Sequence, residues 1–349
     1  MNRKMSAHPG KLGQGLAPDA AAGAPVSQQL REPLRDPLSF RLSVPATSAN
    51  LGPGYDSLGL ALEWRDEIKV TASPRAEPAA PEVSVRVHGE GAAELPTDAS
   101  HLVVTAVQRI LAAKGYWLPD LQVHAHNTIP HSRGLGSSAA AIATAVLTAG
   151  QLLPGGLSAE EQLQIGARIE GHPDNYVPAL RGSVAISWQA AETPQPVFRT
   201  APLSPHPELT CVLAVPSFMQ STQAARDLLP VTVAHQQAAR NSSRAALLVH
   251  AITTEPALLL DATEDYLHQE YRRAAFPQSM ALVDQLRAAN YAAVISGAGP
   301  AVLVLTEASR AASCVELVGT IADSAGGADT FAARSLPIAR TGATVEVLQ

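Results

Sequence analysis

Hydrophobic and polar residues alternate in short runs along the first half of the chain, and apolar residues recur at helical spacing between these runs. Alternation with a period of two is typical of a half-buried strand, whereas recurrence every three to four residues is typical of an amphipathic helix. The alternating runs predict strands over residues 40–45, 67–71, 82–88, 121–126 and 183–188. The helical pattern predicts helices over residues 101–114, 137–152 and 158–170.

The second half of the chain mixes the same two patterns. Strands are predicted over residues 210–215, 291–295, 301–305 and 343–348. Helices are predicted over residues 221–229, 233–253 and 277–289, and a further helix precedes the last strand. Because strands and helices are interspersed in both halves, the pattern predicts an α+β protein with two domains.

Two stretches without an apolar period mark the ends of the predicted domains. Residues 1–37 are rich in Ala, Gly, Pro, Gln and Arg, a composition that predicts a disordered extension. Residues 191–207 are rich in Pro and Thr and form the predicted linker. We therefore expect an N-terminal domain over residues 38–200 and a C-terminal domain over residues 208–349.

The bulk composition excludes several classes of function. The chain of 349 residues has a formal net charge of −6 and no long basic run, which disfavours nucleic acid as a partner. Its two cysteines, Cys211 and Cys314, lie far apart, so neither a disulfide framework nor a thiolate zinc site is expected. No stretch resembles a membrane span or a secretory signal, so we expect no membrane partner and a cytoplasmic location.

The most informative segment joins a predicted strand to the alanine-rich helix that follows it. It runs Pro130-His131-Ser132-Arg133-Gly134-Leu135-Gly136-Ser137-Ser138-Ala139-Ala140. Glycines let the backbone approach a ligand closely, and the free N–H groups and dipole of a helix start favour an anion. The hydroxyls of Ser137 and Ser138 can cap the helix, contact phosphate or bind Mg²⁺. The segment therefore predicts a phosphate-binding loop, which we call the glycine loop.

Three other interpretations compete with this one. The first is a capped helix after a flexible turn, which needs no ligand. The second is the dinucleotide fingerprint of a nicotinamide oxidoreductase, which Gly134-x-Gly136-x-x-Ala139 fits formally. That fingerprint needs an acidic residue at the end of a strand about 20 positions on, and a helix is predicted there. The third is a Walker loop, which is rejected because the segment lacks the required lysine.

A pair of histidines, His124 and His126, lies on the predicted strand before the glycine loop, with His131 nearby. Alternate residues of a strand point to one face, so a zinc site is conceivable. No acidic or thiol ligand lies close in sequence. The pattern therefore favours half-exposed histidines at the mouth of the loop.

Three motifs in fixed order give the chain a resemblance to a known superfamily. The first is P-A-T-S-A-N-L-G-P-G-Y-D-S-L-G over residues 45–59, the second is P-x-x-x-G-L-G-S-S-A-A over residues 130–140, and the third is S-G-A-G-P over residues 296–300. Together they resemble the GHMP kinases, named for galactokinase, homoserine kinase, mevalonate kinase and phosphomevalonate kinase. The resemblance covers the chain from about residue 40 onward. It implies a two-domain fold with a ribosomal protein S5 domain 2-like N-terminal domain and a ferredoxin-like C-terminal domain.

Three further segments make the resemblance closest to the homoserine kinase family. They are E-G-H-P-D-N over residues 170–175, S-T-Q-A-A-R over residues 221–226 and L-H-Q-E-Y-R over residues 267–272. Two departures from the family pattern occur: Tyr176-Val177 replaces the usual Val-Ala after Asp-Asn, and Glu270 replaces a common proline. Both lie beside expected substrate contacts in the sequence. The resemblance implies ATP-dependent phosphorylation of the L-homoserine hydroxyl, a step of threonine biosynthesis, and a tendency to form homodimers.

The resemblance also assigns ligands to single residues. It places the phosphates of ATP against residues 130–140 and Mg²⁺ against Ser138 and Glu170, which supply the oxygen ligands that this metal prefers. It places homoserine against Asn50, Asp56, His172, Thr222, Arg226 and Arg272. The substrate carboxylate prefers a bidentate guanidinium, which suits the two arginines, and its ammonium prefers a carboxylate, which suits Asp56.

Phosphoryl transfer depends chiefly on alignment and on neutralising charge. Asn50 and Arg226 are therefore the predicted catalytic residues, because they would orient the substrate and screen developing charge. Asp174 is the third predicted catalytic residue, because it occupies the position of a catalytic Asp in mevalonate kinase-like relatives. Homoserine kinases are described without an obvious base, so its expected role is structural or auxiliary, orienting the loop beside His172. Two alternatives stay open: a GHMP kinase for another small alcohol, such as mevalonate or a sugar, and a non-catalytic binding protein with the same fold.

Overall fold

The structure, a computed structural model, describes residues 30–75, 80–191, 196–219, 225–324 and 331–348. Its larger sheet contains seven strands of these residues. They are β1 Leu38–Ala49, β2 Leu58–Ser73, β3 Val83–Gly89, β4 Asp120–Asn127, β5 Val184–Ala191, β6 Val197–Leu203 and β11 Thr344–Val347. The order is β11-β1-β2-β4-β3, and β5 pairs with β2 and β6.

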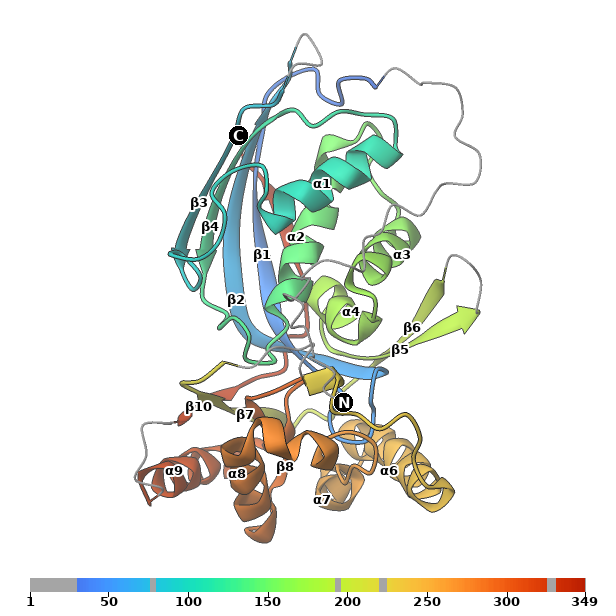
Figure 1. Cartoon of the computed structure of the whole chain (residues 1–349), viewed down its shortest axis with the longest axis vertical. Coiled ribbons are helices and arrows are strands. Elements are labelled where there is room, and N and C mark those ends of the chain that lie inside the picture. The colour runs from blue at the N-terminus through green and yellow to red at the C-terminus, as the bar shows by residue number, and fades with distance from the viewer. Residues whose placement is uncertain (1–29, 76–79, 192–195, 220–224, 325–330, 349) are drawn as a thin grey trace, which may run out of the picture.

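Strands β1 and β2 form the long antiparallel pair at the centre of this sheet (Figure 1). In the first half of β1, Phe40, Leu42 and Val44 are buried while Arg41 is exposed, as the alternating pattern predicts. The register of the pair shifts at Pro45, where β1 enters the first motif. Such an irregularity bends a strand and re-aims the residues that follow it.

Four helices cover one face of the larger sheet (Figure 1). They are α1 Leu102–Ala113, α2 Ser137–Leu152, α3 Ala159–Glu170 and α4 Pro173–Arg181. Helix α2 lies among the others and contacts α1, α3, α4 and β1. Its alanines are mostly buried, and their small side chains allow neighbouring elements to approach closely. The start of α2 therefore has a fixed position at one end of the sheet.

The smaller sheet lies beside this end of the larger one (Figure 1). It contains β7 Leu209–Pro216, β8 Ala292–Ile295, β9 Val302–Glu307 and β10 Phe331–Leu336. Helices α6 His235–Thr253, α7 Leu259–Ala262, α8 Pro277–Ala288 and α9 Ala308–Ser324 accompany it, with short 3₁₀ helices at Pro256–Leu258 and Glu270–Ala275. The strand order β10-β7-β9-β8 and the succession of strands and helices are those of a ferredoxin-like unit. The predicted α+β fold is confirmed.

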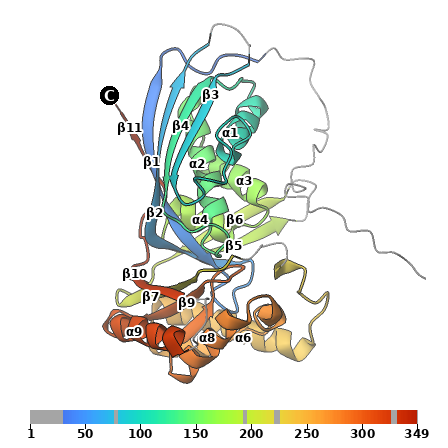
Figure 2. The same ribbon diagram turned by 60° about the vertical axis from the view of Figure 1, so that its left-hand side comes forward.

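The C-terminal end of the chain returns to the larger sheet (Figure 2). Ile338 forms a bridge with Leu62 of β2, and β11 pairs antiparallel with β1 from Ser43↔Thr344 to Phe40↔Val347. We call the larger sheet with its four helices the first unit, and the smaller sheet with its helices the second unit. The last strand thus completes the first unit, not the second. The division between residues 200 and 208 stays a prediction.

Several elements differ from the sequence prediction. Helix α4 and strand β10 were not predicted, and β6 lies inside the predicted linker, where it pairs with β5. The predicted helix over residues 221–229 falls partly outside the described residues. Residues 1–29 of the predicted extension also lie outside them.

The last residues of the predicted extension are attached to the first unit. Arg31 N donates to Gly115 O and Trp117 N donates to Arg31 O, each at 3.1 Å. The Glu32 carboxylate accepts from Trp117 Nε1 at 2.7 Å and from Arg75 N at 2.8 Å. Arg31 and Glu32 are therefore attached to the first unit, and the boundary of the extension near residue 37 stays a prediction.

Candidate active site

The three sequence motifs meet at the glycine loop. Gly134 and Gly136 have φ of 76° and 69°, a region that favours glycine. A Cβ on Gly134 would lie 2.1 Å from Ser296 O of the third motif, and one on Gly136 would lie 1.8 Å from Thr47 Oγ1 of the first. Glycine is therefore required at both positions to let the other two motifs pack against the loop.

Hydrogen bonds hold the loop from both sides. Thr47 N donates to Leu135 O at 3.0 Å. The buried Ser296 Oγ lies 2.6 Å from Gly134 O and 2.8 Å from Ser48 Oγ. The loop is thus fixed by the protein itself, as a preorganised site requires.

The first turn of α2 lacks a side-chain cap. Its N-cap residue is Gly136, and no side chain among the described residues accepts from the helix start. Uncapped N–H groups at a helix start attract an anion, and the helix dipole adds to this attraction. The arrangement fits the predicted phosphate site.

A hydroxyl and a carboxylate lie together beside this helix start. Ser138 Oγ donates to Glu170 Oε2 at 3.0 Å, and Glu170 is the last residue of α3. Burial raises the pKa of Glu170, while His172, Ser138 and Arg226 oppose that rise. The pair supplies the oxygen donors that suit Mg²⁺. Because Arg226 also acts on Glu170, the second half of the chain reaches this site.

Not every side chain of the predicted ATP-binding segment faces the helix start. The Arg133 guanidinium donates to the backbone carbonyls of Pro216, Ser217 and His131 at 2.8–2.9 Å. The side chains of Leu135, Ala139 and Ala140 are buried in the core. For these residues, only backbone atoms are available to a ligand.

The first motif forms a loop that places Asn50 and Asp56 near the glycine loop. Asn50 has φ of 70° and is buried. Its Oδ1 accepts from Asp56 N at 3.0 Å, and its Nδ2 donates to Gly297 O at 2.9 Å. Asn50 thus ties the first motif to the third, a structural role that an Asx residue in a loop often has.

The carboxylate of Asp56 pairs with the Arg226 guanidinium. Oδ1 lies 2.8 Å from Nη2, and Oδ2 lies 3.4 Å from Nη1. Both side chains are about one-third exposed, at 37% and 31%. A ligand can therefore reach this pair from solvent.

Arg272 is a buried cation on the 3₁₀ helix Glu270–Ala275. It is 1% exposed, and no ion pair joins it to an acidic group of the described residues. Its Nε donates to Ala225 O at 3.0 Å, and its Nη1 lies 3.3 Å from His268 Nδ1. Burying a charge without an opposite charge is costly, so the site favours an anionic ligand.

Tyr55 brings the two arginines together. The Cζ atoms of Arg226 and Arg272 lie 5.8 and 5.4 Å from the centroid of its ring. Both guanidinium groups are within the range of a cation–π contact with one ring. The site can thus present two cations to one carboxylate.

His172 and Asp174 flank the start of α4. His172 Nδ1 lies 3.3 Å from Asp174 Oδ1, and Asp174 is almost fully buried. Burial lowers the pKa of His172, but Asp174 and Glu170 raise it by more, so the net pKa lies above the usual value. Thr222, the remaining predicted substrate contact, lies outside the described residues.

Family models and curated relatives both match this chain. Residues 101–183 match the model of the GHMP kinases N terminal domain, and residues 248–318 match that of the GHMP kinases C terminal domain. Homoserine kinase of Clavibacter michiganensis is 45% identical over 83% of this chain and 90% of its own. Homoserine kinase of Streptomyces coelicolor is 42% identical over 88% of this chain and 94% of its own.

The chain belongs to the homoserine kinase family of GHMP kinases.

Solved structures share the fold of this family. The crystal structure of homoserine kinase from Cytophaga hutchinsonii has a TM-score of 0.74 at 22% identity and covers 90% of this chain and 98% of its own. Mevalonate diphosphate decarboxylase from Staphylococcus aureus has a TM-score of 0.63 at 16% identity, covering 90% and 98%. At these identities the likeness shows the fold alone.

Both departures from the homoserine kinase pattern point away from the site. The Tyr176 ring is buried against α3, where its hydroxyl donates to Gln162 O at 2.7 Å. Glu270 is 69% exposed and pairs with Arg273 at 2.8 Å. Their positions beside substrate contacts in the sequence therefore do not make them contacts in space.

Sequence reasoning missed four residues that build the site: Thr47, Ser48, Tyr55 and His268. The first three lie inside the first motif, so their small hydroxyls and aromatic ring were visible in the pattern without an assigned role. His268 lies in the L-H-Q-E-Y-R segment and contacts Arg272. Its partner across the fold, Gly52, is 216 residues away, a pairing that no local pattern reveals.

The zinc site and the dinucleotide fingerprint find no support among the described residues. No group of three or more His, Cys, Asp or Glu residues there is arranged to hold a metal ion, and His124 and His126 are exposed on β4. Helix α3, not a strand, follows α2, so the dinucleotide fingerprint lacks its second strand. None of the described helices is both long and apolar enough to cross a membrane.

Proposed function

We propose that this protein is a homoserine kinase that transfers the γ-phosphoryl group of ATP to the side-chain hydroxyl of L-homoserine. The observation that carries the proposal is the combination of two binding features in one site. An uncapped helix start suits phosphate, and beside it two arginines and one carboxylate suit a zwitterionic amino acid.

The nucleotide would bind along α2. The backbone N–H groups of the glycine loop and the hydroxyl of Ser137 would hold its phosphates. A groove of about 480 Å³ between α1 and α3 would receive the base. Its lining is largely apolar and includes Leu102, Ala106, Ile110, Ile165 and Ile169. Ile169 of this lining directly precedes Glu170 of the proposed metal-binding pair.

Mg²⁺ would be held by Ser138 and Glu170, whose oxygens lie 3.0 Å apart. When bound, it would neutralise phosphate charge during transfer. The chain's own contribution is to fix both oxygens on the ends of two packed helices, α2 and α3. The fit rests on this donor pair.

The amino acid would bind across the first motif and the second half of the chain. Asp56 would accept from its ammonium group, and Arg226 and Arg272 would bind its carboxylate. Arg272 suits this role because it is buried without an acidic partner among the described residues. Arg226 would keep its contact with Asp56, so that the zwitterion completes an alternating arrangement of charge.

Transfer would depend on alignment more than on a dedicated base. Asn50 has a second amide N–H that can donate to the substrate or to the phosphoryl group in flight, because an amide nitrogen carries two. His172 would complete the polar lining. Asp174 would orient His172, since its buried carboxylate already lies 3.3 Å from the imidazole.

The test is an ADP-release assay over homoserine, serine, threonine, mevalonate and galactose, with Mg-ATP in excess. The proposal predicts that homoserine has the highest kcat/KM by at least about tenfold, because only it matches both charged groups and the length to the hydroxyl. Preference for mevalonate or galactose would overturn the proposed substrate. A homodimer stays a prediction.

A further inference from the structure

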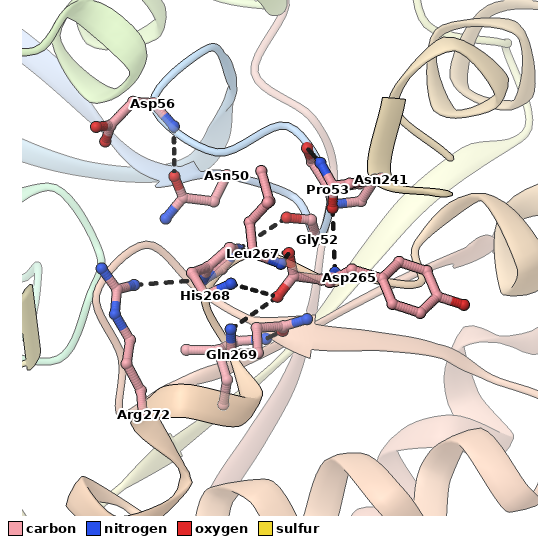
Figure 3. Close-up of polar contacts among 12 residues, drawn as sticks. Asn50, Gly52, Pro53, Asp56, Asn241, Asp265, Leu267, His268, Gln269 and Arg272 are labelled. Atoms are coloured by element: carbon pink, nitrogen blue, oxygen red, sulfur yellow. Dashed lines mark hydrogen bonds and ion pairs between the residues drawn. The ribbon is translucent and has the colours of Figure 1, made fainter. Parts of the chain in front are cut away.

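A buried histidine connects the two sides of the proposed substrate site. His268 is 1% exposed and lies just before the 3₁₀ helix that carries Arg272. Its Nε2 lies 2.8 Å from Gly52 O in the first motif, and its Nδ1 lies 3.3 Å from Arg272 Nη1. Figure 3 shows the imidazole between these two partners.

These contacts require one protonation state of the imidazole. A guanidinium has donors only, so Arg272 must donate to Nδ1, which must carry a lone pair. A carbonyl oxygen only accepts, so Nε2 must carry the hydrogen and donate to Gly52 O. Both bonds are satisfied together by the neutral Nε2–H tautomer and by no other form.

Hydrogen bonds of neighbouring residues fix the backbone segment that carries His268. Asp265 accepts from the backbone N–H groups of Leu267, His268 and Gln269, which shapes the segment (Figure 3). Gln269 Oε1 in turn accepts from Ile295 N at 2.6 Å, beside the third motif.

The first-motif loop is fixed against the same segment. Gly52 has φ of 86°, and a Cβ there would lie 2.6 Å from Thr263 O, so this loop cannot shift away without a change in packing. The Tyr55 ring lies 5.1 Å from the imidazole.

We propose that His268 is a positioning residue that, through its neutral Nε2–H tautomer, sets Arg272 relative to the first-motif loop that carries Asp56. The proposal rests on the proposed function, since it assigns Arg272 to the substrate carboxylate and Asp56 to its ammonium. The proposal gives His268 no contact of its own with either ligand. It fixes the spacing of the two groups that do.

The donor and the acceptor of His268 can be removed separately. His268→Asn places an amide oxygen near Nδ1 and keeps an acceptor for Arg272, whereas His268→Gln reaches toward Nε2 and keeps a donor for Gly52 O. We expect His268→Gln to raise the KM for homoserine about tenfold, the effect of losing one hydrogen bond to a charged group. We expect a smaller increase for His268→Asn. In both variants the KM for Mg-ATP should change less than about twofold.

The pH dependence gives a readout that a purely structural role would not change. Protonation converts Nδ1 into a donor and places a cation against Arg272, so the KM for homoserine should rise as pH falls. Burial lowers the pKa of His268, Asp265 at 3.7 Å opposes this, and Arg272 adds to it, with Asp56 and Tyr55 also nearby. His268→Asn should remove this increase.

The experiment measures homoserine and ATP kinetics between about pH 5 and pH 8 for the parent, both variants and His250→Asn. His250 is a half-exposed histidine of α6, and its replacement should change neither KM nor pH profile. Equal homoserine KM values for parent and His268→Gln, or parallel changes in both KM values, would overturn the proposal.

Nitrogen-15 NMR of the histidine rings, without substrate, separates this proposal from the proposed function. A single Nε2–H signal that His268→Asn removes supports the positioning role even if homoserine proves to be the wrong substrate. If the signal that His268→Asn removes came from an Nδ1–H tautomer or from a charged ring at neutral pH, the proposal would be contradicted.

Discussion

At the scale of single residues, the two arginines of the site have different partners. Arg226 already pairs with Asp56, and its pKa is raised because this carboxylate outweighs the effect of burial. Burial lowers the pKa of Arg272, which among the described residues donates to Ala225 O, lies near His268 Nδ1 and contacts the Tyr55 ring. A substrate carboxylate would therefore gain more from Arg272, whose charge is not yet balanced.

Replacing Arg272 tests this difference. We expect Arg272→Gln to raise the KM for homoserine at least tenfold while the KM for Mg-ATP changes little, because the lost bond is to a charged group of one substrate only. Steady-state kinetics measure both constants. Arg273→Gln is the matched control. Arg273 follows Arg272 in the chain, but its guanidinium pairs with Glu270 and Asp284 on the surface. An unchanged homoserine KM in Arg272→Gln would remove this residue from the substrate site.

The Ser138–Glu170 pair predicts a pH-dependent requirement for Mg²⁺. Burial raises the pKa of Glu170, so protons compete with the metal for its carboxylate at a higher pH than for an ordinary Glu. The Mg²⁺ concentration for half-maximal activity should therefore rise as pH falls toward about 5. Ser138→Ala should raise this concentration at every pH. If Ser138→Ala and the parent gave identical Mg²⁺ titrations, this pair would be ruled out as the metal site.

At the scale of elements, the sequence predicted those with strong local signals. Helix α2 begins and ends as predicted, at Ser137 and Leu152, because the glycine loop and the alanine run mark it clearly. Helix α4 was missed because Pro173 and Pro178 suggest a break, although Pro173 occupies the first turn, where proline is tolerated. Strand β6 was missed because its proline-rich surroundings resemble a linker, and only pairing with β5 makes it a strand.

For the candidate site too, the sequence predicted local features but not contacts between distant segments. Residues inside the motifs, such as Asn50, Asp56 and Ser138, were found because the resemblance carries them. The Arg226–Asp56 pair joins residues 170 positions apart, and its geometry depends on how the two units pack. Nothing in the local sequence states that Arg272 is buried, since a helical arginine is usually solvated.

The contact between α3 and α4 predicts an asymmetric effect of two glycine substitutions. A Cβ on Gly166 of α3 would lie 1.9 Å from Tyr176 Cζ, whereas one on Gly319 of α9 meets nothing within 4 Å. Gly166→Ala should lower the free energy of unfolding by about 1–3 kcal/mol through overpacking. Gly319→Ala should raise it by up to about 1 kcal/mol through helix propensity. Denaturant unfolding measures both.

A second substitution tests the cause of the first. Combining Gly166→Ala with Tyr176→Val should cost less than the sum of the two single changes, since the smaller side chain vacates the space that the new methyl group needs. Strictly additive effects would show that the two residues do not share this contact.

At the scale of the whole molecule, the C-terminal segment closes the first unit. Ala339 N donates to Ala61 O at 2.9 Å, and Ala343 N donates to Ala179 O of α4 at 2.8 Å. Strand β11 then pairs with β1. The far end of the chain thus supports the helix whose start carries His172 and Asp174.

Removing residues 343–349 should therefore destabilise the first unit. The deletion leaves β1 with an unpaired edge and Ala179 O without its donor, so we expect a lower Tm and weaker activity. Thermal unfolding followed by circular dichroism measures the change, and retained secondary structure at low temperature would show that the truncated chain still folds. An unchanged Tm would contradict the supporting role of this segment.

The central claim concerns the whole site. The start of α2 would bind the phosphates of ATP while the two arginines bind the carboxylate of the amino acid, so that both substrates are held at once. Phosphorus-31 NMR of the enzyme with Mg-ATP and L-homoserine observes the product directly. The account predicts that the γ-phosphate signal of ATP is replaced by that of a phosphomonoester on the homoserine hydroxyl. Release of inorganic phosphate alone, with homoserine unchanged, would contradict it.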